Sequence, residues 1–161
     1  AVDHYVINAI TDGAALAADE ATTADTVTNF DAGEDKIVIG KTMEAALGNV
    51  GNAGTLNISA ANGGAINKST ADSDVFVIDN ATQNDLDDLS NVIGTIGNTT
   101  YAEGDDFFVI VNNAAGTSAG VYYIEGAEAN TGAAILTSEI ALVGIITTDA
   151  AIATTDVILG S

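Results

Sequence analysis

The sequence predicts a mainly β fold, a β-sandwich or β-roll-like domain with one or two short helices. Short runs of β-branched and aromatic residues recur along the chain, separated by stretches rich in Gly, Asn, Asp and Thr that are typical of turns. In addition, 47% of the 161 residues are hydrophobic, although the formal net charge is −20. Acidic disordered chains are poor in apolar residues, so this chain is expected to fold.

The first predicted strand lies within residues Val2 to Ile10, where Tyr5 and Ile7 share one face and Val6 lies on the other. The segment Asp25 to Gly40 then predicts a hairpin, with strands TVTNF and KIVIG on either side of the turn DAGED. A turn of acidic residues and glycine between alternating apolar residues is typical of such a hairpin.

Two short helices are predicted. Residues 42–47 (TMEAAL) form the first, and Thr42 is placed to cap it. Residues 84–93 (NDLDDLSNVI) form the clearer one, because their apolar side chains follow at three- and four-residue spacing.

Further strands are predicted at residues 75–79, 106–111 and 120–125, with one more possible at residues 55–59. The apolar segment 135–146 predicts one or two strands, or a helix followed by a strand, and a last apolar run lies in TTDVILGS. There is no strict repeat and no clear linker, so we expect one β-rich domain over residues 1–161. A subdivision near residue 70, into an N-terminal hairpin region (1–70) and a C-terminal β region (71–161), stays open.

The composition limits the possible partners. Twenty-three acidic residues accompany three lysines and no arginine, so the basic patch that nucleic acid requires cannot form. The absence of cysteine excludes disulfides and thiolate metal sites. The sequence contains no run of about twenty apolar residues, so no membrane span is predicted. Calcium is the simplest neutralising cofactor because it takes oxygen ligands, which favours an extracellular calcium-dependent protein over an intracellular enzyme.

The densest group of oxygen ligands surrounds the predicted turn at residues 25–35. A hairpin turn gathers side chains from both strands, and Gly33 permits the positive φ that lets backbone carbonyls point inward. Calcium needs six to eight such oxygens. The predicted ligands are Asp25, Asn29, Asp31 and Asp35. The alternative is a solvated turn without metal.

A second acidic turn precedes the predicted strand at residues 106–111. Its predicted calcium ligands are Glu103, Asp105 and Asp106. Neither an EF-hand loop nor the glycine-rich nonapeptide of calcium-binding β-rolls occurs in the sequence.

No enzymatic activity is expected. Carboxylate pairs with the spacing of a glycosidase arise by chance in so acidic a chain. His4 is the only histidine, and it is interpreted as a surface residue of the first strand. The nucleophile elbow, the P-loop and the dinucleotide fingerprint are all missing from the sequence.

Two stretches resemble a known family. HYVINA and TADTVTNFDAGEDKIVIG resemble the segment that follows the calcium-binding repeats of bacterial RTX-type surface proteins, with its pattern D-x-I-T-D-F-x-x-G-x-D-x-I-x-L. The stretches DDFFVIVNNAAGTSAGVYYIEG and LTSEIALVGIITTDAAIATTDVIL are similar to the C-terminal β region of the same proteins. Residues 43–73 are unmatched.

The resemblance is carried by Asp25, Thr28, Phe30, Gly33, Asp35 and Ile37. Asn29 stands where the family commonly has Asp, and Asp31 occupies a free position of the pattern. The resemblance implies calcium-dependent folding, export by the type I secretion machinery through a C-terminal signal, and a place outside the cell or on the surface of a bacterium.

These features are consistent with two functions. The first is a secreted structural protein that self-assembles, with calcium, into a homopolymeric filament, sheet or surface layer. Exposed apolar strands are templates for pairing between subunits, so the two apolar terminal segments are the predicted joints. Their predicted interface residues are Val2, Tyr5, Ile7, Ile152, Val157 and Leu159. The alternative is the C-terminal calcium-folding and type I secretion module of a larger adhesin or hydrolase.

Overall fold

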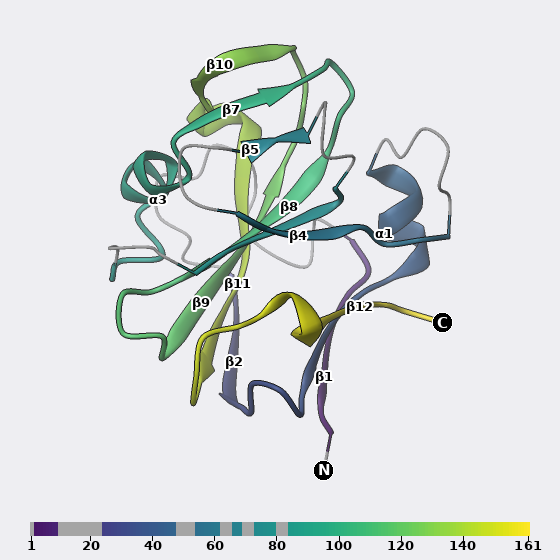
Figure 1. Ribbon diagram of the computed structural model, residues 1–161, viewed down its shortest axis with the longest axis vertical. Coiled ribbons are helices and arrows are strands. Elements are labelled where there is room, and N and C mark those ends of the chain that lie inside the picture. Colours follow the sequence, from purple (N-terminus) through teal and green to yellow (C-terminus); the bar gives the residue numbers. More distant parts are fainter. Residues whose placement is uncertain (1, 10–23, 48–53, 62–65, 69–72, 80–83) are drawn as a thin grey trace.

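The computed structural model describes residues 2–9, 24–47, 54–61, 66–68, 73–79 and 84–161, and it confirms the mainly β fold with a few short helices (Figure 1). The strands are β1 (His4–Ile7), β2 (Asp25–Phe30), β3 (Lys36–Ile39), β4 (Ile58–Ala61), β5 (Ile66–Asn67), β6 (Val75–Ile78), β7 (Asn98–Tyr101), β8 (Phe107–Asn112), β9 (Ser118–Ile124), β10 (Asn130–Ala134), β11 (Ile140–Thr148) and β12 (Val157–Leu159). The helices are α1 (Lys41–Ala46), α3 (Leu89–Ile96) and the 3₁₀ turns η2 (Thr137–Glu139) and η3 (Thr154–Asp156).

A six-stranded mixed sheet with the order β2-β11-β9-β8-β6-β4 forms the centre of the fold. β9 is antiparallel to both β8 and β11, whereas β6 is parallel to both β8 and β4. β6 and β8 are buried along their whole length. A strand covered on both faces needs apolar residues on both, which explains why VFVI and FFVIV lack the polar alternation of a half-exposed strand.

Two layers cover this central sheet. Phe107, Val109 and Val111 face a core that is completed by α3, β5 and β7. Their neighbours Phe108 and Ile110 face a second core, completed by α1 and by a three-stranded sheet of the order β1-β3-β12. The small sheet of β1, β3 and β12 is therefore one outer layer of the molecule.

Both predicted helices exist, with different starts. α3 begins at Leu89, because the Asp88 side chain caps it by accepting hydrogen bonds from the backbone N–H groups of Ser90 (3.0 Å) and Asn91 (3.2 Å). α1 begins after Gly40, and no side chain caps it, so the prediction of a Thr42 cap was wrong.

The predicted hairpin at residues 25–40 was wrong in its pairing, although both of its strands exist. β2 pairs in parallel with β11 of the central sheet, whereas β3 pairs with β1 and β12 in the outer layer. The turn between them holds Gly33 at a φ of 93°, and the N–H groups of Glu34 and Asp35 both donate to the Asp31 carbonyl (3.0 and 2.8 Å). This turn carries the chain from one layer to the other instead of returning it along the same sheet.

The predicted strands at residues 75–79, 106–111 and 120–125 correspond to β6, β8 and β9. The segment 135–146 contains η2 followed by the start of β11, and the last apolar run is β12. The possible strand at residues 55–59 is shifted to β4, and Ile10 of the first predicted segment lies outside the described residues.

Candidate functional site

The turn at residues 31–35 is organised by carboxylates from three parts of the chain. The backbone N–H groups of residues 31, 32 and 33 each donate to a different acid. The acceptors are, respectively, Asp35 (2.8 Å), Asp149 (2.9 Å) and Asp156 (3.0 Å). Lys36 adds a contact of its Nζ to Asp156 at 3.4 Å. The turn thereby binds the segment before β12 to the connection between β2 and β3.

Asp35 also holds the start of β1. Its Oδ1 accepts a hydrogen bond from the backbone N–H of Asp3 at 2.7 Å, and the Lys36 N–H donates to the Asp3 carbonyl at 2.9 Å. The Asp35 side chain is buried. The hydrogen bonds from the N–H groups of Asp31 and Asp3 lower the pKa of Asp35 below its ordinary value, because they favour the charged carboxylate.

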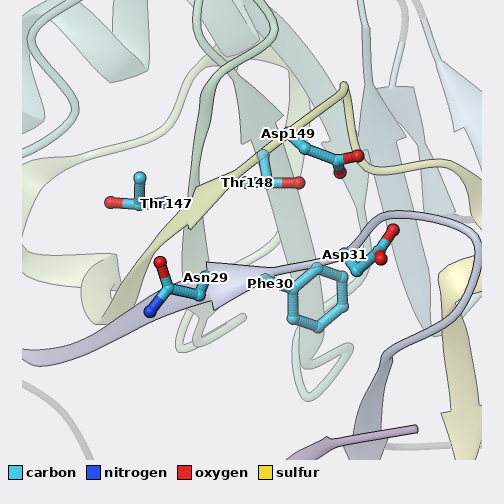
Figure 2. A pocket seen from close by; sticks show the side chains of 6 residues that line it. All are labelled: Asn29, Phe30, Asp31, Thr147, Thr148 and Asp149. Atoms are coloured by element: carbon cyan, nitrogen blue, oxygen red, sulfur yellow. The ribbon is translucent and has the colours of Figure 1, made fainter. Parts of the chain in front are cut away.

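The structure separates the four ligands predicted around this turn. Asp25 is exposed at the far end of β2, six residues from Asp31, which corresponds to about 20 Å along a strand. Asn29 and Asp31 line a pocket of about 350 Å³, together with Asp149 and neighbouring residues. Figure 2 shows Asn29 toward one side of this pocket and the two carboxylates toward the other. Asp35 lies inside the turn with both oxygens bound by amides.

The second predicted metal turn is also built from carboxylates that bind protein donors. Asp105 accepts from the Ala102 N–H (2.8 Å). Asp106 accepts from the Gly126 N–H (3.0 Å) and from the Tyr123 hydroxyl (2.7 Å). Burial, followed by the hydrogen bond to Asp106, raises the pKa of Tyr123. Glu103 is exposed beside them.

Within the described ranges, no three acidic or histidine side chains come together as a group that holds a metal ion. The carboxylates around both turns instead accept hydrogen bonds from the backbone. Calcium binding by these residues stays a prediction.

The residues predicted for assembly lie in the outer sheet and beneath it. β1 and β12 both pair in parallel with β3 of the same chain, in the registers Ile7↔Ile39 and Leu159↔Ile39. Three of the six predicted interface residues belong to the protein's own core. They are Ile7, Ile152 and Val157. Tyr5 packs against the same core, Leu159 is half-buried, and Val2 is exposed.

Tyr5 connects β1 to the central sheet. Its hydroxyl occupies the place that a β-carbon on Gly144 of β11 would take. Only a glycine leaves room for this contact, which places the β1 sheet directly against β11.

The outer face of the small sheet carries a row of apolar side chains. Val6 of β1, Val38 of β3 and Ile158 of β12 lie level with one another in the pairing register. Val38 is buried between its neighbours, whereas Val6 is 44% and Ile158 37% exposed, and Val2 ahead of β1 is 59% exposed. Among the described residues, the only other exposed large apolar side chain is Leu136. Exposed apolar residues are thus concentrated on β1, on β12 and just before β1.

The two edges of this sheet differ from the bulged edge strands β2 and β10. β1, β3 and β12 contain no acidic residue, in a chain with 23 acids. Within the described part of the chain, no strand pairs with the outer side of β1 or of β12. The edge strand β2 has two residues opposite one of β11, where Asn29 adopts a φ of 60°. The edge strand β10 has a similar bulge at Gly132 (φ 98°). Bulges obstruct pairing with another chain, and the ladders of β1 and β12 with β3 have none.

Sequence reasoning placed strands at both β1 and β12, but it missed their exposed residues Val6 and Ile158 and the long-range partners of the turn. The carboxylates of Asp149 and Asp156 were not among the predicted site residues. Asp149 directly follows β11, and Asp156 is the last residue of η3. No local pattern marks a carboxylate whose partner amides lie more than one hundred residues away.

Comparison of the chain with family models, with curated proteins and with solved structures found no match. The helices in the described part of the chain are too short or too polar to cross a membrane.

Proposed function

We propose that this chain is a secreted structural subunit that self-assembles into a polymer through the sheet of β1, β3 and β12. One observation carries the proposal. The sheet has two edges without bulges or acidic residues, and these edges hold the exposed residues Val6 and Ile158. Edge strands with this character are templates for pairing with another chain.

The charge of the molecule supports this choice of surface. A subunit with a net charge of −20 repels its copies, so contacts are favoured where no carboxylate stands in the interface. The three strands carry only His4 and Lys36 as potentially positive side chains, and Lys41 begins α1 two residues after β3. This sheet is accordingly a surface that a second acidic copy can approach with little repulsion.

Cations are expected to promote this assembly. Calcium or another multivalent cation lowers the repulsion between whole subunits, and it acts on exposed carboxylates such as Asp25, Asp31 and Glu103. Assembly is therefore expected to increase with calcium and, more weakly, with sodium chloride.

The test is light scattering with negative-stain microscopy of the pure protein, titrated with calcium and then with a chelator. Val6→Asp places a carboxylate on the open edge of β1 and is expected to raise the concentration needed for assembly about tenfold or more. Leu136→Asp is the matched control, because Leu136 is an apolar residue outside this sheet that is at least as exposed as Val6. Assembly of Val6→Asp at the wild-type concentration would contradict the proposal. A monomer under every cation condition would leave the alternative of an export and calcium-folding module.

A further inference from the structure

The two edges of the β1-β3-β12 sheet, with which no strand of the described residues pairs, are complementary to each other. All three strands run in the same direction. One edge is β1 and the other is β12, so a second copy placed beside the first continues the sheet in the order β1-β3-β12-β1-β3-β12. The two edges of an antiparallel hairpin would not repeat in this way.

The backbone groups that point outward can be identified from the hydrogen bonds inside the sheet. The N–H groups of Lys36 and Gly40 donate to the carbonyls of Asp3 and Ile7, so the odd-numbered residues of β1 face β3. Successive residues of a strand point to opposite sides, which leaves the N–H and C=O of Val6 directed away from β3. Val6 at the middle of β1, like His4 at its start, can thus bond to a neighbouring strand.

The backbone groups of β12 alternate in the same way. The Gly160 N–H donates to the Ile39 carbonyl, so Ile158 also faces β3. The C=O of Val157 and the N–H of Leu159 therefore point outward. In a parallel ladder, the N–H and C=O of a residue on one strand bond to the two residues that lie before and after the opposite residue on the other strand. Val6 of the next copy satisfies this pattern if it lies level with Ile158.

We infer that copies of this chain join head to tail, with the outer edge of β12 pairing in parallel with the outer edge of β1 of the next copy. The Val6 N–H of one copy donates to the Val157 carbonyl of the other, and the Leu159 N–H donates to the Val6 carbonyl. This register places Val6 beside Ile158, and it continues the row that these residues form with Val38 inside each copy. The inference rests on the proposed function and specifies its joint.

The side chains and charges of the two edges fit this arrangement. Val6 and Ile158 are both exposed and apolar, and each covers the other in the joined sheet. Neither edge strand contains an acidic residue within its own bounds, and in this register His4 lies level with Asp156, which directly precedes β12. The interface uses different surfaces on the two copies, and repetition of such a contact gives a ring if the rotation closes or a filament if it does not.

Cysteine cross-linking tests the joint, because the natural chain has no cysteine. Val6→Cys and Ile158→Cys are prepared separately, mixed under assembly conditions and oxidised. Neighbouring strands lie about 5 Å apart, within the Cα separation that a disulfide spans. We expect a covalent dimer in the mixture and none with either variant alone. Leu136→Cys is the control for random collision, and thermal unfolding of each reduced variant confirms that it is folded.

Three other results of this cross-linking experiment would overturn the inference. Cross-linking of Val6→Cys to itself would show a contact between two β1 strands and overturn the inference. If the wild type and the cysteine variants all form polymers but the variants do not cross-link, the inference would be overturned. The proposed self-assembly would stand in that case. Absence of polymers from the wild type would overturn both.

A further variant distinguishes edge pairing from exchange of β1 between copies. Val6→Cys with Val38→Cys in one chain forms a disulfide that locks β1 to its own β3. Edge pairing predicts that the locked protein still assembles. Assembly that appears only after reduction would show strand exchange and would contradict the inference.

Discussion

The backbone N–H of Asp3 donates to the carboxylate of Asp35 at 2.7 Å, so the residue that precedes β1 is tied to the residue that precedes β3. The same carboxylate accepts from the Asp31 N–H at 2.8 Å. One buried acid thereby fixes the start of the outer sheet and the turn that leads into it. This arrangement makes the position of β1 sensitive to the charge of Asp35.

The first prediction concerns Asp35→Asn. An amide has one acceptor oxygen and directs an NH₂ group at the other backbone donor, so one of the two hydrogen bonds is lost. We expect a lower unfolding temperature and faster hydrogen exchange at the β1–β3 ladder than elsewhere. Asp31→Asn, which changes an exposed carboxylate in the same turn, is the control and is expected to have little effect. Equal effects of the two variants would contradict this role of Asp35.

The second prediction is the pH dependence of the same contact. The pKa of Asp35 is lowered in the folded protein from its ordinary value of 3.8. Its stabilising contribution is therefore complete above that value and is lost as the pH falls from there toward the folded pKa. Urea unfolding between neutral pH and pH 2 measures this loss. The Asp35→Asn variant should show a smaller change in unfolding free energy over that acidic range than the wild type.

The third prediction concerns Asn112, a fully buried residue at the end of β8. Its Oδ1 accepts from the Ile152 N–H (2.7 Å), and its Nδ2 donates to the carbonyls of Ile152 (2.9 Å) and Ile78 (3.2 Å). Asn112→Leu leaves these buried backbone groups without partners, and we expect a loss of about 2–4 kcal/mol in unfolding free energy. Asn130→Ala, which removes a half-buried amide that also bonds to the backbone, is the comparison for urea unfolding. A loss no greater than that of Asn130→Ala would show that Asn112 does not hold Ile152.

The fourth prediction concerns the buried ion pair of Lys68 and Asp74, whose Nζ and Oδ1 are 3.2 Å apart. Lys68→Met leaves the Asp74 charge buried, and removal of one partner of such a pair typically costs about 3–5 kcal/mol. Lys68→Met combined with Asp74→Asn should recover part of that loss, because the double variant buries no charge. The Asn side chain can still accept from the Asn57 N–H, as Asp74 does at 2.8 Å. Additive losses in the double-mutant cycle would contradict the coupling.

The fifth prediction concerns the contact of Tyr5 with Gly144. A β-carbon on Gly144 would overlap the Tyr5 hydroxyl, so Gly144→Ala is expected to displace Tyr5 and destabilise the outer sheet. Adding Tyr5→Phe removes the overlapping oxygen and should restore part of the stability. Thermal unfolding of the two single variants and the double variant measures this effect. If Tyr5→Phe worsens Gly144→Ala, the packing of β1 on β11 is not as described.

The strands with strong apolar patterns were predictable from the sequence. VFVID, DFFVIV and GVYYIE combine β-branched and aromatic residues over the length of a strand, and they became β6, β8 and β9. The opposite faces of Tyr5 and Val6 also follow from alternation alone. By contrast, β7 and β10 have the sequences NTTY and NTGAA. Those sequences contain few β-forming apolar residues, and the strands form because each pairs with the other.

The pairing of the strands was beyond the reach of local patterns. An acidic turn between two apolar strands predicts a hairpin, yet the carboxylates of Asp149 and Asp156 bind this turn and leave β2 and β3 in different layers. The same long-range contacts were not foreseen when this turn was predicted to bind calcium, and calcium binding there stays a prediction. Asp35 accepts two backbone hydrogen bonds there, a role that composition cannot distinguish from metal binding.

Residue-resolved hydrogen exchange of the assembled and dispersed protein reports on the joint between copies at the level of single amides. The N–H groups of Val6 and Leu159 point away from β3 and should exchange rapidly in the dispersed protein. If copies join through the β1-β3-β12 sheet, both amides become protected together in the polymer. Polymers in which Val6 and Leu159 exchange as fast as in the dispersed protein would contradict the account.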